Sequence, residues 1–199
     1  MKENSCGDLS TGNDPVKSVN HALAVDNLRK TFSDQSGLKL VLSDISFVVD
    51  EGEIVSLVGP SGCGKSTLLH VLAGFDTDFQ GSVKFAGQAI AGPSIERGMI
   101  FQTPQLFSWL SVEDNIGFGL KRAGVPKEER QILVNEFLRG VGMEEYRSYY
   151  PSQLSGGMRQ RTALARTLIM KPSLILMDEP FSALDYPARL EMQQLTLDL

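Results

Sequence analysis

Residues 54–73 read IVSLVGPSGCGKSTLLHVLA, and this stretch decides the fold. Its first five residues form a nearly continuous apolar run that predicts a buried strand, and residues 65–73 have the apolar spacing of a helix. Between them, residues 59–66 satisfy the pattern G-x-x-x-x-G-K-[ST], whose glycines let backbone N–H groups converge on a phosphate. Lys65 supplies a point charge, Ser66 can bind magnesium, and the helix presents its positive N-terminal end. The stretch therefore predicts a phosphate-binding loop.

The candidate ligand-binding residues of this loop are Gly59, Pro60, Ser61, Gly62, Cys63, Gly64, Lys65, Ser66 and Thr67. The alternative is an ordinary glycine-rich turn. The intact Gly-Lys-Ser end, with a predicted strand before it and a predicted helix after it, favours the phosphate loop.

A second predicted strand, residues 173–177, ends in the acidic pair Asp178 and Glu179. In phosphate-loop proteins such a strand brings a carboxylate to the magnesium side of the pocket, which assigns Asp178 to the metal. Glu179 is placed to orient and deprotonate the water that attacks the γ-phosphate. Alone, an acidic pair after a strand is more often a solvated strand end, but the phosphate loop upstream favours the catalytic interpretation.

Residues 154–161 read LSGGMRQR at the start of a predicted helix over residues 155–170. With these motifs in this order, the sequence resembles the ATP-binding cassette (ABC) transporter ATPases, whose signature motif reads L-S-G-G-Q. Met158 stands at the final Gln position, which is a departure from the family. The resemblance implies that Ser155, Gly156 and Gly157 face the ATP of a partner subunit. Ser155 is equally an ordinary helix N-cap, and the two interpretations agree because a capped helix start also attracts anions.

The resemblance extends to other positions. Phe32 stands where the family places an aromatic ring that stacks on adenine, although taken alone it would be a core residue. Gln102 resembles the glutamine that reaches the Mg²⁺ and the attacking water and links the core to a helical subdomain. Ser182 and Asp185 resemble the loop that crosses the dimer interface.

The family implies a mechanism that requires a dimer. Two cassettes close head to tail, each ATP lies between one phosphate loop and the partner's signature helix, and hydrolysis drives attached membrane subunits. The expected cofactors are ATP and Mg²⁺, and the expected location is the cytoplasmic face of the cell membrane as a peripheral subunit.

Residues 92–102 and 107–116 most resemble the ATPases of nitrate, sulfonate and taurine importers, which act with a permease and, indirectly, a solute-binding protein. The family docks the permease after the glutamine loop. The candidates for that contact are Leu106, Phe107, Trp109 and Leu110. The alternative for Phe107 and Trp109 is the core of the helical subdomain. A soluble cassette ATPase and a nucleotide-binding fragment without hydrolysis also stay open.

Composition agrees with one globular domain. The chain has 199 residues and a net charge of −5, which argues against a surface built to coat nucleic acid. No uncharged run is long enough to span a membrane, and residues 1–20 contain no apolar signal region. Cys6 and Cys63 fit a reducing compartment without disulfides.

The expected fold class is α/β, a phosphate-loop core with an antiparallel layer and an inserted helical subdomain. We expect a mobile tail over residues 1–20 and an ATPase domain over residues 21–199, with the helical subdomain at about residues 103–165. Short strands at 38–42 and 45–49 belong to the antiparallel layer, separated by a turn at Ser43 and Asp44. The family also carries a histidine that contacts the γ-phosphate, and neither His21 nor His70 is placed for that role. We therefore expect a C-terminally truncated cassette that ends in a helix over residues 187–199.

Overall fold

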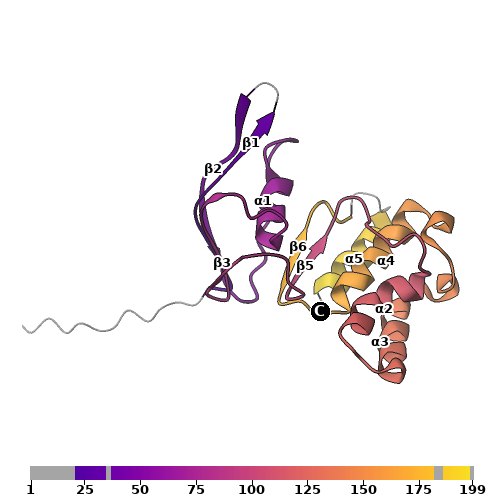
Figure 1. The fold of residues 1–199 in the computed structure, drawn as a ribbon. Coiled ribbons are helices and arrows are strands. Elements are labelled where there is room, and N and C mark those ends of the chain that lie inside the picture. Colours follow the sequence, from indigo (N-terminus) through magenta and orange to yellow (C-terminus); the bar gives the residue numbers. More distant parts are fainter. Residues whose placement is uncertain (1–20, 35–36, 182–185, 198–199) are drawn as a thin grey trace, which may run out of the picture.

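The computed structural model describes residues 21–34, 37–181 and 186–197. The predicted tail and the candidate interface residues Ser182 and Asp185 lie outside these residues, so both stay predictions, as does the division into domains. A search of the described residues finds no helix with the length and apolar character that a membrane crossing demands. Figure 1 shows an antiparallel sheet at one side, a central parallel strand pair, and a group of helices at the other side.

The antiparallel sheet has four strands in the order β2-β1-β3-β4, which confirms the predicted antiparallel layer. These strands are β1 Leu23–Asp34, β2 Gly37–Val49, β3 Gln80–Phe85 and β4 Gln88–Ala89. The sheet is irregular where β1 passes β3. At Gly81, with φ +96°, an added Cβ would lie 2.4 Å from the carbonyl oxygen of Asn27, so only glycine fits this close approach.

The predicted turn at Ser43 and Asp44 is wrong, because β2 continues through both residues. Asp44 has a positive φ of 52° and sits at an irregularity in the pairing with β1. Its carboxylate accepts two hydrogen bonds from the guanidinium of Arg29, at 2.6 and 2.7 Å. This contact with the neighbouring strand accompanies a bulge at a position where the local sequence favours a turn.

The first helix covers the sheet. Helix α1, Lys65–Ala73, buries Leu68, Leu72 and neighbouring apolar residues in one cluster with Leu28 and Val83 of the sheet. It ends at Gly74, whose φ of +83° is the left-handed conformation typical of a helix C-terminus. Helix α1 also lies against the second sheet and therefore sits between the two.

The second sheet is the parallel pair of β5, Arg97–Ile100, and β6, Leu174–Met177. Strand β6 confirms the predicted strand before the acidic pair. The backbone N–H of Asp178 donates to the carbonyl of Ile100 at 2.9 Å, which continues the pairing to the start of that pair. The carboxyl ends of both strands therefore meet at one edge of the sheet.

The predicted strand at residues 54–58 is wrong for this structure. The segment has no strand assignment, neither described sheet includes it, and Val58 is 94% exposed. An apolar run becomes a strand only when a neighbouring strand pairs with its backbone. Among the described residues no strand takes that place, so the local pattern alone does not produce a strand.

The helices other than α1 lie in a separate group with its own apolar cluster. They are α2 Val112–Arg122, α3 Lys127–Gly140, α4 Gly156–Leu168 and α5 Tyr186–Leu197, with 3₁₀ turns at Glu144–Tyr146 and Pro151–Gln153. Helices α2 and α3 are separated by residues 123–126, which include Gly124 and Pro126. Helices α2, α3 and α4 stand between β5 and β6 in sequence, so they form an insertion into the parallel pair.

Candidate nucleotide-binding site

The phosphate loop leaves the N-terminus of α1 open to an anion. Gly64 is the N-cap residue, and no side chain accepts a hydrogen bond from the first turn, which also contains no acidic residue. The first backbone N–H groups of the helix therefore lack a side-chain acceptor, and the helix dipole adds positive potential. Gly64 has φ +98°, and an added Cβ would lie 2.9 Å from the Leu42 side chain and 3.1 Å from the Val41 carbonyl. The loop is thus fixed against β2.

Lys65 points back into the loop. Its Nζ donates to the carbonyl oxygens of Gly59 at 2.9 Å and Pro60 at 3.0 Å, and lies 3.9 Å from Cys63 Sγ. Cys63 is exposed and is not a core residue, and its Sγ occupies the space beside Gly59, where a Cβ would lie 2.8 Å away. The ammonium group is therefore held at the loop by uncharged carbonyls, which an anion can replace.

The ends of β5 and β6 bring two of the candidate catalytic residues together. Gln102 follows β5, and its Nε2 donates to Oε2 of Glu179 at 2.8 Å. Glu179 has a positive φ of 45°, which turns the chain directly after Asp178. The phosphate-loop pattern predicted Glu179 and the family resemblance predicted Gln102; the structure places the two side chains in contact, although their catalytic roles stay predictions.

The phosphate loop and the carboxyl ends of β5 and β6 are linked through α1 and its C-terminal end. The ring of Phe101 lies 5.7 Å from that of Phe75 and 6.2 Å from that of His70. The hydrogen bonds that Lys65 donates to Gly59 and Pro60 stay within its own loop. A shared metal between Ser66 and Asp178 therefore stays a prediction.

The donor set fits magnesium. Ser66, Asp178 and Gln102 offer a hydroxyl, one carboxylate and an amide oxygen, and Mg²⁺ in nucleotide sites uses one or two carboxylates together with phosphates. Among the described residues, no group of three or more His, Cys, Asp or Glu side chains could hold a metal ion.

Phe32 lies at the same end of the sheet as the phosphate loop. The β1–β2 register pairs Phe32 with Lys39, two residues from Val41, which borders Gly64. The ring is 43% exposed and lies outside the described apolar clusters, so it is not a core residue. Its position leaves a ring surface available for a base.

The signature segment starts α4 as expected. Ser155 is the N-cap residue, and its Oγ accepts a hydrogen bond from the N–H of Met158 at 3.2 Å. Gly156 and Gly157 form the first turn, with no acidic side chain nearby in sequence. Met158 packs against the apolar cluster of the helical group, where a glutamine would bury an amide.

Phe107 and Trp109, the two aromatic candidates in the segment before α2, differ in burial. Phe107 is half-buried, with its ring 4.4 Å from Phe118 and the Arg166 guanidinium 5.2 Å away, whereas Trp109 is 71% exposed. Leu106 and Leu110 are half-buried. Phe107 therefore belongs to a packed aromatic group, and the exposed ring of Trp109 lies at the edge of that group, 5.5 Å from the ring of Phe107.

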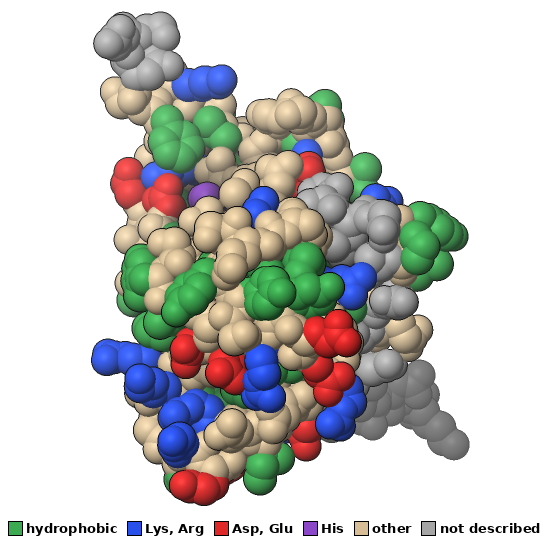
Figure 2. All heavy atoms as spheres, turned by 90° about the vertical axis from the view of Figure 1, so that its right-hand side faces the viewer, with side chains coloured by type: hydrophobic (Ala, Val, Ile, Leu, Met, Phe, Trp, Pro, Cys, Tyr) green, Lys and Arg blue, Asp and Glu red, His purple; other side chains and the backbone are tan. Residues whose placement is uncertain are grey.

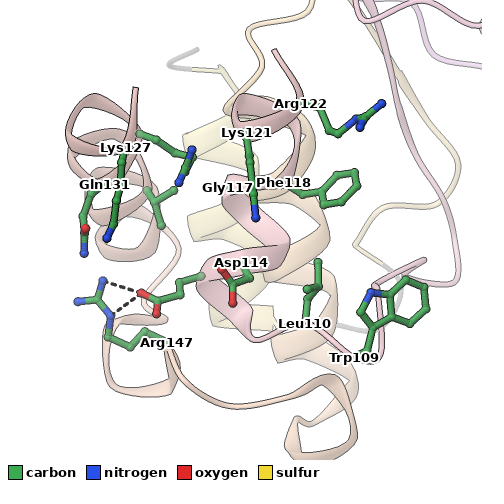
Figure 3. Close-up of a pocket in the computed structure, with 13 residues that line it drawn as sticks. Trp109, Leu110, Asp114, Gly117, Phe118, Lys121, Arg122, Lys127, Gln131 and Arg147 are labelled. Atoms are coloured by element: carbon green, nitrogen blue, oxygen red, sulfur yellow. Dashed lines mark hydrogen bonds and ion pairs between the residues drawn. The ribbon is translucent and has the colours of Figure 1, made fainter. Parts of the chain in front are cut away.

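A cavity of about 590 Å³ lies beside this segment, between α2 and α3 (Figure 3). Trp109, Leu110 and Phe118 supply apolar lining, and the charged lining includes Lys121 and Lys127. Figure 2 shows the face built by the helical group, with hydrophobic side chains in a band and charged side chains of both signs gathered below it. The surface is one on which an amphipathic element can pack.

Sequence reasoning missed two buried polar residues. Asn115 is fully buried and bonds to the backbone of residues 107–111, and Lys30 is a buried cation beside Phe32. Each stands next to charged or polar neighbours that look solvated in sequence. The sequence signal for Asn115 was its place three residues after the start of a helix. The signal for Lys30 was its place two residues before an aromatic residue.

Three comparisons with known proteins bear on this geometry. The family model described as ABC transporter matches residues 42–182. The chain is 49% identical over 171 residues to the aliphatic sulfonates import ATP-binding protein SsuB 2 of Burkholderia lata, covering 86% of this chain and 60% of that protein. It is 46% identical over 168 residues to the taurine import ATP-binding protein TauB of Escherichia coli K12, covering 84% of this chain and 66% of that protein. The chain thus spans 60 to 66% of the length of these relatives.

Among solved structures, the chain is similar to the ATP-binding cassette MJ0796 in a dimeric post-hydrolysis state bound to ADP and Pi. The TM-score is 0.81 at 30% identity, over 87% of this chain and 81% of that one. A second dimeric structure of the same cassette gives a TM-score of 0.82.

Proposed function

Since this chain belongs to the ABC transporter family, we propose that it is the ATP-binding subunit of a membrane importer and hydrolyses ATP as a dimer. The phosphate loop carries this proposal, because it combines an uncapped helix N-terminus, an available lysine and a fixed position against β2. These features together fit a polyphosphate better than an isolated glycine turn does.

Each candidate residue has a role in this proposal. The N–H groups of residues 59–67 and the Lys65 ammonium bind the phosphates, and Phe32 stacks on adenine. Ser66, Asp178 and Gln102 hold Mg²⁺, which when bound neutralises charge on the β- and γ-phosphates. Glu179 accepts the proton of the attacking water, and its hydrogen bond with Gln102 keeps the carboxylate directed along the sheet edge.

The dimer completes each site. In the proposed arrangement, Ser155, Gly156 and Gly157 at the start of α4 face the γ-phosphate bound by the partner subunit, and Ser182 and Asp185 line the interface. The first turn of α4 starts with two glycines and contains no acidic residue, which supports this role. The dimeric state of the MJ0796 structures supports the stoichiometry.

The permease partner docks on the helical group. Exposed Trp109 and the cavity between α2 and α3 offer an amphipathic helix of the permease a surface that combines apolar side chains with charged ones. This places the subunit at the cytoplasmic face of the membrane, with a solute-binding protein as an indirect partner. The names of the relatives support a sulfonate or taurine as the solute. Nitrate or a related small solute rests on the resemblance of residues 92–102 and 107–116 alone.

Two substitutions test the proposal on this chain. Lys65→Ala should abolish Mg-ATP binding in titration calorimetry, because the loop loses its only lysine charge. Glu179→Gln should bind ATP, stop hydrolysis and raise the dimer fraction in size-exclusion chromatography. Lys84→Ala, on the exposed face of β3, is the matched control and should behave as wild type.

The outcomes separate the alternatives. Equal ATP affinity in wild type and Lys65→Ala would refute the phosphate loop. Wild-type binding without turnover would instead identify a nucleotide-binding chain that does not hydrolyse ATP. Turnover with no association with any permease subunit would favour a soluble cassette ATPase.

A further inference from the structure

Lys30 of β1 is a buried cation with a complete set of partners. The residue is only 4% exposed. Its Nζ donates to Asp76 Oδ1 at 2.8 Å and to the backbone carbonyl of Asp78 at 2.5 Å, and lies 3.4 Å from Asp78 Oδ2. Burial without partners would favour the neutral amine, so these acceptors keep the group charged.

The two aspartates beside Lys30 keep its side chain charged. Burial lowers the pKa of Lys30, but the hydrogen bond and charge of Asp76 and the charge of Asp78 outweigh burial, so the pKa is raised. The group is therefore a permanent ammonium at neutral pH.

The same ammonium lies over the ring of Phe32, with Nζ 4.8 Å from the ring centroid. A cation at this distance is attracted to the face of an aromatic ring. One face of Phe32 is therefore occupied by Lys30, while the side chain as a whole stays 43% exposed. The contact limits the ring to orientations that present the other face outward.

The acceptors of Lys30 belong to the segment that follows the phosphate-loop helix. Asp76 comes two residues after Gly74, where α1 ends. Lys30 thus joins β1, the ring of Phe32 and the chain leaving α1 at one point. A ring held this way needs no further ordering when a base arrives.

We propose that Lys30 is a positioning residue that fixes the ring of Phe32 for the adenine base, so that Lys30 controls the preference of the site for ATP over a triphosphate without a base. This inference rests on the proposed function, in which Phe32 contacts adenine. Lys30 itself touches no part of the nucleotide. A cation behind the ring also withdraws electron density from the face left open, which favours stacking on an electron-rich base.

The test compares two ligands on the full chain. Titration calorimetry gives dissociation constants for Mg-ATP and for magnesium tripolyphosphate. The dissociation constant of tripolyphosphate divided by that of Mg-ATP is the ratio that measures the contribution of adenosine. Lys30→Met should lower this ratio about fivefold, a change in the range of a partly desolvated cation–π contact, with tripolyphosphate affinity constant within about twofold. Lys30→Arg, which keeps the cation, should restore most of the ratio, and Lys84→Met is the matched surface control.

A second pair of measurements distinguishes positioning from general stability. In a Phe32→Ala background, Lys30→Met should leave the ratio unchanged, because the ring on which Lys30 acts is absent. Should Lys30→Met fail to fold, Asp76→Asn removes the charge that holds Nζ and should lower the ratio at least twofold.

Each result has a defined meaning. An unchanged ratio in Lys30→Met, or an equal loss of affinity for both ligands, would overturn the positioning role while leaving the proposed function intact. Absence of ATP binding by the wild type would overturn the proposed function, and this inference with it.

Discussion

Among the Asn and Gln side chains that the structure describes, we expect the replacement of Asn115 to destabilise the protein most. Its Oδ1 accepts from the N–H of Phe107 at 2.9 Å, and its Nδ2 lies 3.1, 3.0 and 2.9 Å from the carbonyls of Phe107, Leu110 and Ser111. The side chain is fully buried and holds the segment that precedes α2. Its loss removes the contacts that shape this loop.

The magnitude follows from the partners. Two amide hydrogens and one oxygen supply the equivalent of three hydrogen bonds, each worth about 1 kcal/mol net. Phe107 O also accepts from the N–H of Leu110, and Ser111 O from the N–H of Asn115, so both keep a partner in Asn115→Ala. The Phe107 N–H and the Leu110 carbonyl lose the partner described here, and each such buried group costs about 1 kcal/mol or more. We expect a loss of about 3 to 5 kcal/mol in the free energy of unfolding.

Urea denaturation followed by circular dichroism measures this loss. Asn135→Ala is the control, because Asn135 is half-exposed and accepts one bond from Arg147 at 2.8 Å. It should cost less than about 1 kcal/mol. Trp109, the only tryptophan in the sequence, reports the loop itself by fluorescence. If Asn115→Ala and Asn135→Ala differed by less than 1 kcal/mol, the reasoning from buried hydrogen bonds would be refuted.

Three further predictions concern other parts of the chain. Gly74→Ala should destabilise the protein by more than about 2 kcal/mol in urea denaturation, because φ is +83° and the new Cβ would lie 2.2 Å from a carbonyl oxygen. Gly124→Ala, with φ +79° and no atom within 4 Å, should cost only about 1 kcal/mol, and equal costs would contradict the steric argument. Cys63 is exposed beside the loop lysine, so Mg-ATP should slow the reaction of its thiol with maleimide. Mass spectrometry maps the labelled sites, and Cys6 is the control, whose labelling should not change with ATP. If ATP did not change the labelling of Cys63, the thiol would lie away from the phosphates. The pKa of Lys30 is raised above its ordinary 10.5, so its ion pair stabilises the fold below that pH and the stabilisation is lost as pH rises through the higher folded-state value. Lys30→Met should therefore flatten the fall in melting temperature above about pH 10.5, and identical alkaline curves would show that the pair contributes nothing.

Local patterns predicted those elements whose stability is mostly local. The helix after the phosphate loop and the helix at the signature segment carry their own start signals, and both appear where expected. The strand before Asp178 also appears, since β5 pairs with it. Residues 54–58 have an equally strong strand pattern, yet without a paired neighbour the pattern is not sufficient.

Long-range polar contacts explain what the sequence did not reveal. Lys30 follows another basic residue and looks solvated, and only the fold brings Asp76 to it. Ser43 and Asp44 look like a turn because the bond from Arg29 across the sheet is invisible in the local sequence. Glu179 was predicted from the phosphate-loop pattern and Gln102 from the family resemblance. Their direct hydrogen bond was not predicted, because it depends on the pairing of β5 and β6, which lie far apart in the chain.

The insertion of α2, α3 and α4 between β5 and β6 also sets an order for folding. Residues 101–173 separate the two strands, and closing a flexible loop of that length costs about 4 kcal/mol of chain entropy. The inserted helices have their own apolar cluster, so they can form from short-range contacts before the strands meet. Once formed, they bring the two strand ends together and remove most of that entropic cost. Amide hydrogens of α2 and α4 should therefore gain protection from exchange early in refolding, and those of β5 and β6 only afterwards, which makes the edge that carries Gln102 and Glu179 one of the last parts of the protein to assemble.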